Sequence, residues 1–195
     1  MILYSPIDTP LGRVGLLWEA GRRSPFILRV ILPGGDELQG RSARRDASER
    51  TVLPDTDGIA GSMPQAKQRR LSEVIRRLRE YGEGRSVVFS LQGLDMDLCS
   101  PFQYQVLDVT FKIPRGKVTT YGGLAGRLLL PGGARAVGTA LGRNPFPLII
   151  PCHRVVRTSG DLGGFGGGLP LKRTLLAMEG ITFDGKGRVR PEHIL

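Results

Sequence analysis

The sequence changes character after about residue 90, and this change limits the available folds more than any other feature. The earlier part consists of short runs in which apolar and other residues alternate between Gly and Pro, as in β-strands. A hairpin that turns at residues 9–12 is predicted for ILYSPIDTPLGRVGLLWEAG, and further strands for PFILRVIL and SVVFSL. Residues 64–84 place apolar side chains at helical spacing: Leu71, Val74, Ile75, Leu78 and Tyr81. This part therefore predicts a small antiparallel sheet with one helix.

The later part is typical of helices joined by glycine-rich turns. Ser100, followed by a proline, is an N-cap that predicts a helix through about Phe111. Thr120 can cap a short helix over residues 121–130, and another helix covers residues 134–143. Two short helices joined by a tight turn are typical of a helix-turn-helix, although ordinary helical hairpins give the same pattern. A last helix is predicted for PLKRTLLAMEG.

Together the two parts predict an α+β protein with two domains. Residues 1–90 form a structural N-terminal domain, and residues 91–195 form a mostly helical domain with the helix-turn-helix. Residues 34–63 are polar and predict a loop or an insertion. No apolar run approaches the roughly 20 residues that cross a bilayer. We therefore expect a soluble protein without a membrane partner, cytoplasmic or, in a eukaryote, nuclear.

The chain is strongly basic, with 28 Lys and Arg against 18 Asp and Glu and a formal net charge of +10. Such an excess is typical of proteins that bind nucleic acid, but it is also found where charge only keeps a protein soluble. The five arginines of residues 64–84 allow the same two interpretations, phosphate contacts or a solvated helix face.

Only two cysteines occur, Cys99 and Cys152, too few for a disulfide framework or a four-ligand zinc site. Cys152 stands in a Pro-Cys-His-Arg sequence, and a neighbouring His or Arg can make a thiol more reactive. A cysteine beside a histidine is also common in buried structural positions. The motifs around Cys152 therefore decide its interpretation, and we interpret Cys99 as a buried bystander.

The motifs around Cys152 occur together in one known family. They are PCHRVV at 151–156, RAVG at 135–138 followed by Asn144-Pro145, PFQ at 101–103, IPRG at 113–116, Tyr121 and LLAMEG at 175–180. In this order and spacing, residues 100–180 resemble the O6-alkylguanine-DNA alkyltransferases, also called methylated-DNA-protein-cysteine methyltransferases. The N-terminal half resembles them only loosely.

The resemblance implies direct-reversal DNA repair, in which Cys152 takes the alkyl group from O6 of guanine once and irreversibly. His153 would act as the base through a bound water, and Glu179 would orient the imidazole. Tyr121 would donate to ring nitrogen N3 of the leaving guanine, and Asn144 would tie the helix-turn-helix to the active-site strand. Apart from the resemblance, His153 and Glu179 also fit packing and capping roles.

The resemblance also implies that the damaged nucleotide is flipped out of duplex DNA, with Arg135 taking its place in the stack. The other predicted DNA-binding residues flank this arginine or cap the helix before it: Ala134, Ala136, Gly138 and Thr120. The predicted substrate pocket consists of Tyr121, Val155, Phe165 and Gly166.

Two positions depart from the family pattern. Leu107 stands where Trp is frequent, and Phe165-Gly166 where Tyr-Ser is frequent. The second change removes two hydroxyls but keeps the Gly166 amide, so we expect bulky O6 groups such as benzyl to be accepted.

Three other functions were compared with this interpretation. A non-enzymatic lesion-binding protein of the alkyltransferase-like type is the principal alternative, and the presence of Cys152 opposes it. A plain helix-turn-helix regulator has no need of the Cys-His-Glu set, and a cysteine hydrolase would turn over repeatedly. The favoured interpretation predicts a monomer that acts on double-stranded DNA with O6-alkylguanine and needs no cofactor or metal.

Overall fold

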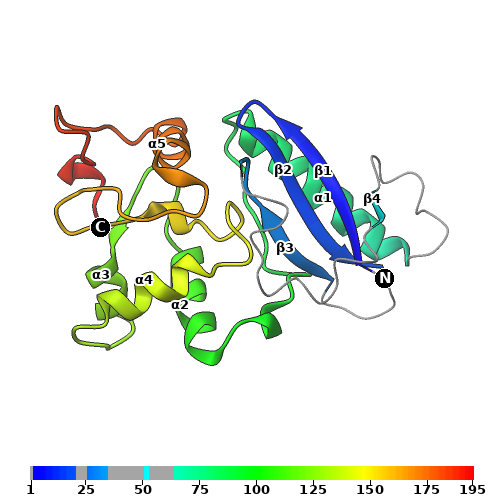
Figure 1. Ribbon diagram of the computed structural model, residues 1–195, viewed down its shortest axis with the longest axis horizontal. Coiled ribbons are helices and arrows are strands. Elements are labelled where there is room, and N and C mark those ends of the chain that lie inside the picture. The colour runs from blue at the N-terminus through cyan, green and yellow to red at the C-terminus, as the bar shows by residue number, and fades with distance from the viewer. Residues whose placement is uncertain (1, 21–25, 35–50, 53–63) are drawn as a thin grey trace. The chain divides into compact units, whose positions relative to one another are not determined.

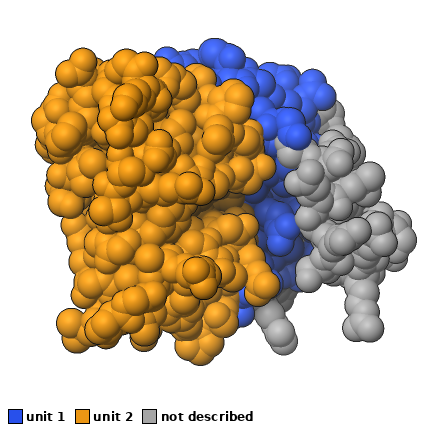
Figure 2. All heavy atoms as spheres, turned by 60° about the vertical axis from the view of Figure 1, so that its left-hand side comes forward, with its two compact units in different colours: residues 1–98 blue, residues 99–195 orange. Residues whose placement is uncertain are grey.

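The computed structural model describes residues 2–20, 26–34, 51–52 and 64–195 (Figure 1). They form two compact units, Met1–Leu98 and Cys99–Leu195, which Figure 2 colours separately. The predicted domain boundary at residue 90 stays a prediction, because compactness alone does not show where independent folding units divide. The predicted loop over residues 34–63 lies outside the described residues, apart from Gly34 and residues 51–52.

The first unit is built on a sheet with strand order β3-β2-β1-β4. β1 (Ile2–Thr9) and β2 (Gly12–Glu19) pair along their whole length, from Ile2 opposite Glu19 to Thr9 opposite Gly12. This confirms the predicted hairpin. β3 (Ile27–Ile31) runs antiparallel to β2, and the two-residue β4 (Thr51–Val52) lies parallel to β1. In β1 the alternation buries Leu3, Ser5 and Ile7 on one face.

Helix α1 (Gln65–Gly82) packs against β1 and confirms the helix predicted there. Its buried face includes Leu71, Leu78 and Tyr81, as the helical spacing predicts. The strand predicted for SVVFSL is wrong, because these residues carry no strand assignment. The position beside β3 is occupied by residues 93–95 instead, where Gly93 accepts from the Phe26 and Ile27 amides and Asp95 donates to Ile27.

The second unit consists of helices around short strands. The short 3₁₀ turn η4 (Met96–Leu98) precedes it, and α2 (Pro101–Phe111) begins where the sequence predicts, because Ser100 Oγ accepts from the Gln103 amide at 3.3 Å. Parallel strands β5 (Thr119–Thr120) and β6 (Val155–Val156) lie near its centre. α5 (Gly168–Met178) and the 3₁₀ turn η6 (Pro191–His193) complete it.

Helices α3 (Tyr121–Arg127) and α4 (Ala134–Gly142) pack against each other across a short turn. Thr120 caps α3 by accepting from the Gly123 amide at 2.9 Å, as predicted. α3 ends earlier than predicted because Leu129 adopts a positive φ of 54° and the Leu130 amide bonds back to Ala125. This is the usual left-handed helix end, here with a leucine where glycine is more common.

The described helices include none that is long and apolar enough to cross a membrane.

Candidate active site around Cys152

Cys152 opens a single 3₁₀ turn, η5 (Cys152–Arg154), between a buried loop and β6. Phe146, Leu148, Ile149 and Ile150 are all buried, so the loop before the turn belongs to the core. The Cys152 amide donates to Ile150, and the Val155 amide donates to the Cys152 carbonyl. The thiol is therefore held on rigid backbone, and its residue is only half-buried.

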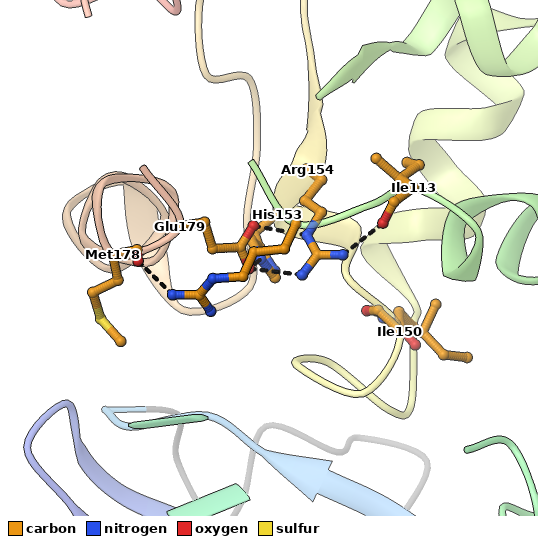
Figure 3. A network of polar contacts seen from close by, with 8 residues as sticks. Ile113, Ile150, His153, Arg154, Met178 and Glu179 are labelled. Carbon is orange, nitrogen blue, oxygen red and sulfur yellow. Dashed lines mark hydrogen bonds and ion pairs between the residues drawn. The ribbon is translucent and has the colours of Figure 1, made fainter. Parts of the chain in front are cut away.

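Two side chains of this turn meet Glu179, the residue that follows α5 (Figure 3). His153 Nε2 lies 3.0 Å from Glu179 Oε1, and both side chains are fully buried. Arg154 donates two hydrogen bonds of 2.8 Å to the same carboxylate, from Nε to Oε2 and from Nη2 to Oε1. Arg154 Nη1 also donates to the Ile113 carbonyl at 2.6 Å, and Arg115 donates to the Met178 carbonyl. The IPRG segment therefore supports both the arginine and the end of α5.

These contacts set the protonation states of the group. Burial raises the pKa of Glu179, but the hydrogen bonds and charges of His153 and Arg154 outweigh it and hold that pKa well below its usual range. Burial lowers the pKa of His153, with partial opposition from Glu179. Burial likewise raises the pKa of the Cys152 thiol. The resting site thus pairs a protonated thiol with a neutral imidazole beside an ionised carboxylate.

Asn144 connects the end of α4 to this turn. Its amide nitrogen donates to the Ile150 carbonyl at 3.0 Å, and its oxygen accepts from the Phe146 amide at 2.9 Å. A further hydrogen bond from its side chain to Cys152 partly offsets the effect of burial on the pKa of the thiol. Asn144 therefore both shapes the loop and touches the nucleophile.

Lys172 is a fully buried cation of α5. Its ammonium donates to the carbonyls of Val155, Leu162 and Gly164, and so ties the glycine-rich loop to the strand. Burial lowers the pKa of Lys172 to about 8, with partial opposition from Cys152. Its charge in turn lowers the pKa of the Cys152 thiol.

A hollow of about 750 Å³ opens beside Cys152, wholly within the second unit. One face of α4 forms one wall, and the loop of residues 163–166 forms the other. Tyr121 lies at the junction, with its hydroxyl 3.5 Å from the Gly164 carbonyl. Phe165 meets the His153 ring edge-on at a centroid distance of 6.3 Å. A ligand in this hollow can therefore contact a thiol, a phenol and the backbone of the glycine loop.

Known proteins share both the sequence and the fold of this site. Residues 101–181 match the family model described as the 6-O-methylguanine DNA methyltransferase DNA binding domain. The chain is 36% identical over 182 residues to the methylated-DNA-protein-cysteine methyltransferase of Mycolicibacterium paratuberculosis, covering 92% of this chain and 93% of that relative. It is 44% identical over 116 residues to the Methanothermobacter thermautotrophicus protein of the same name, a match that spans 65% of that relative.

The chain belongs to the methylated-DNA-protein-cysteine methyltransferase family. A crystal structure of Mycobacterium tuberculosis OGT in complex with DNA has a TM-score of 0.68 and 31% identity, covering 91% of this chain and 92% of that one. The predicted family membership and α+β fold class are thus confirmed.

The hollow brings together many of the residues that the methyltransferase resemblance implicated. Those lining it are Tyr121, Ala134, Arg135, Gly138, Cys152, Phe165 and Gly166. His153 and Glu179 are buried and do not line the hollow. Thr120 caps α3, Ala136 is exposed on α4, and Val155 is buried with its carbonyl bonded to Lys172. The roles assigned to all of these residues stay predictions.

Two members of this site, Arg154 and Lys172, were not predicted from the sequence. Lys172 had a signal: it lies at helical spacing from Leu175, Leu176 and Glu179, so it falls on the apolar stripe of α5, where a charge needs partners. Arg154 had only its place in the PCHR motif. In the part of the chain that the structure describes, no three His, Cys, Asp or Glu side chains are grouped to hold a metal.

Proposed function

We propose that this chain repairs O6-alkylguanine in double-stranded DNA by moving the alkyl group to Cys152, once per molecule. The observation that carries the proposal is that Cys152 lines a hollow, while the next two residues of its turn, His153 and Arg154, are bonded to the buried Glu179 carboxylate. The proposal is also supported by the family to which the chain belongs, because its members are named for this transfer.

The reaction forms one bond and breaks one bond. As Sγ attacks the alkyl carbon, the bond from that carbon to O6 breaks, and the electron pair leaves on the guanine ring. The thiol proton passes to the His153 imidazole through a water, and Glu179 stabilises the resulting imidazolium. Tyr121 donates to N3 of the departing guanine, and amides of the glycine loop donate to O6. The products are guanine in DNA and a thioether on Cys152.

Access to O6 requires the nucleotide to leave the stack, at a cost of a few kcal/mol for unpairing and unstacking. Arg135 projects from the face of α4 that lines the hollow and takes the place of the missing base. Gly138 and Ala134 on the same face let the helix approach the groove closely. The neighbouring Thr139 also lines the hollow.

Mass spectrometry distinguishes this proposal from its alternative, a lesion-binding protein without transfer. After incubation with a duplex containing one O6-methylguanine, Cys152 should carry one added CH₂ unit, and the signal should stop at one per protein. Cys152→Ala should bind the same duplex without gaining mass. A chain that binds the lesion but never gains mass would refute transfer and favour the lesion-binding function.

The pocket also bears on the size of the alkyl group. Three glycines line the wall at 163, 164 and 166, and a Cβ added at Gly164 or Gly166 would meet no atom of the described residues within 4 Å. We therefore expect transfer of benzyl groups from O6-benzylguanine. Absence of a Cys152 benzyl adduct, while methyl transfer from DNA proceeds, would contradict this expectation.

A further inference from the structure

Arg157 lies beside Tyr121 because of the way two short strands pair. β5 and β6 are parallel, with Thr119 opposite Val155 and Thr120 opposite Val156. The next residues, Tyr121 and Arg157, follow the carboxyl ends of the two strands and therefore leave the sheet at the same end. Both line the hollow that Cys152 faces.

The backbone of Arg157 is fixed, while its guanidinium is available. The Arg157 amide donates to the Asp161 carbonyl at 2.8 Å, and its carbonyl accepts from Gly160 at 2.9 Å. The Asp161 carboxylate is engaged by the Ser159 hydroxyl. Within the described residues the exposed guanidinium makes no hydrogen bond or ion pair. The fold thus holds an uncompensated cation at this place without using it for its own stability.

The hollow has a simple charge pattern. Among the described residues that line it, the charged ones are Arg135 and Arg157, with no carboxylate. Arg135 comes from α4 and Arg157 from the end of β6. When a nucleotide enters such a hollow base first, its sugar and phosphates stay at the exposed mouth, where a guanidinium can form two parallel hydrogen bonds to phosphate oxygens.

We propose that Arg157 binds a backbone phosphate beside the flipped nucleotide and so holds the lesion in the pocket. This rests on the proposed function, because it assumes that the guest is a nucleotide in DNA. Arg135 and Arg157 then have separate tasks: Arg135 occupies the gap in the stack, and Arg157 fixes the strand that has been displaced.

The test compares a substrate that has phosphates with one that has none. Arg157→Gln should slow methyl transfer from a subsaturating O6-methylguanine duplex roughly tenfold, and lower the slope of log K against log salt by about one. Transfer from the nucleoside O6-methyl-2′-deoxyguanosine should stay unchanged. Arg157→Lys should keep most of the rate on DNA. Arg173→Gln removes the same charge from a side chain that lies over Phe183 rather than in the hollow, and should not slow transfer.

A scan of neutral methylphosphonates around the lesion identifies the phosphate. One position should slow the wild-type protein and leave Arg157→Gln unaffected. Equal losses on duplex and nucleoside would overturn the proposal, because Arg157 would then act on the departing purine. An unchanged rate on the duplex would overturn it as well. If the wild-type protein itself transfers no methyl group from DNA, the proposed function fails first.

Discussion

At the scale of single residues, the site depends on buried charges that are stabilised in different ways. Glu179 is bonded to the neutral imidazole of His153 and to the charged guanidinium of Arg154, and stays ionised. Within the described residues, the hydrogen-bond partners of the Lys172 ammonium are backbone carbonyls alone, and burial therefore brings its pKa down to about 8. One group is fixed in its charged state, and the other is close to losing its proton under mildly alkaline conditions.

Replacing Glu179 by Gln should destabilise the protein by about 3–5 kcal/mol, because Arg154 would lose its partner while largely buried. The pKa of Glu179 is depressed in the folded state, so its contribution is present above the unfolded value near 4.5 and is lost as the pH falls below it. Urea unfolding of both proteins at several pH values checks this. A stability difference that stays constant from neutral pH to well below 4.5 would contradict it.

Lys172→Met keeps the buried aliphatic chain but removes the ammonium that joins the Val155 carbonyl to the glycine loop. Methyl transfer should fall roughly tenfold or more, because several charged hydrogen bonds are lost. Between pH 8 and 10.5 the unfolded chain holds the Lys172 proton and the folded chain has released it. Wild-type stability should therefore rise relative to the variant over this range. Denaturant titrations at both ends measure the difference, and parallel pH profiles would argue against a lowered pKa.

At the scale of elements, the sequence predicted those helices and turns whose formation depends on residues close together in the chain. Alternation gave the β1–β2 hairpin, and Ser100 and Thr120 marked helix starts that their side chains do cap. The prediction of a strand at SVVFSL was wrong because a strand also needs a neighbouring strand with free backbone groups. Residues 93–95 already occupy the position beside β3. The contact between Arg154 and Glu179, 25 residues apart, had no local signal, because only tertiary packing brings the two together.

The glycine loop and α3 meet at one close contact that glycine alone allows. Gly163 has a φ of +68°, and a Cβ there would lie 2.9 Å from the Tyr121 hydroxyl. Gly163→Ala should displace the phenol and slow transfer from DNA at least tenfold, by the loss of an oriented donor. Gly34→Ala is the matched control, since Gly34 has a similar φ of +70° and no atom of the described residues beyond its chain neighbours would lie within 4 Å of its added Cβ. Single-turnover rates and thermal midpoints of both variants test this. Equal rates for the two would show that the contact has no part in transfer.

At the scale of the whole molecule, the basic charge belongs mainly to one unit. Residues 99–195 carry 13 basic and 5 acidic side chains, a net of +8, whereas residues 1–98 carry a net of +2. In α1, Arg76 pairs with Glu80 and Arg77 with Glu73, so part of its basic face is already neutralised. The unit that contains Cys152 is thus also the one whose charge attracts a polyanion, which favours nucleic-acid binding over a purely solubilising role.

This distribution predicts which arginines matter for binding undamaged duplex DNA. The double variant Arg69→Gln, Arg70→Gln removes two exposed charges from α1, and should leave the slope of log K against log salt unchanged. Arg135→Gln removes one charge from the hollow, and should lower that slope by about one because one fewer counterion is released. Fluorescence anisotropy of a labelled duplex across a salt series measures both slopes. A larger drop for the α1 pair than for Arg135 would place the phosphate contacts on the first unit, and the charge asymmetry between the units would then have no bearing on how the protein meets DNA.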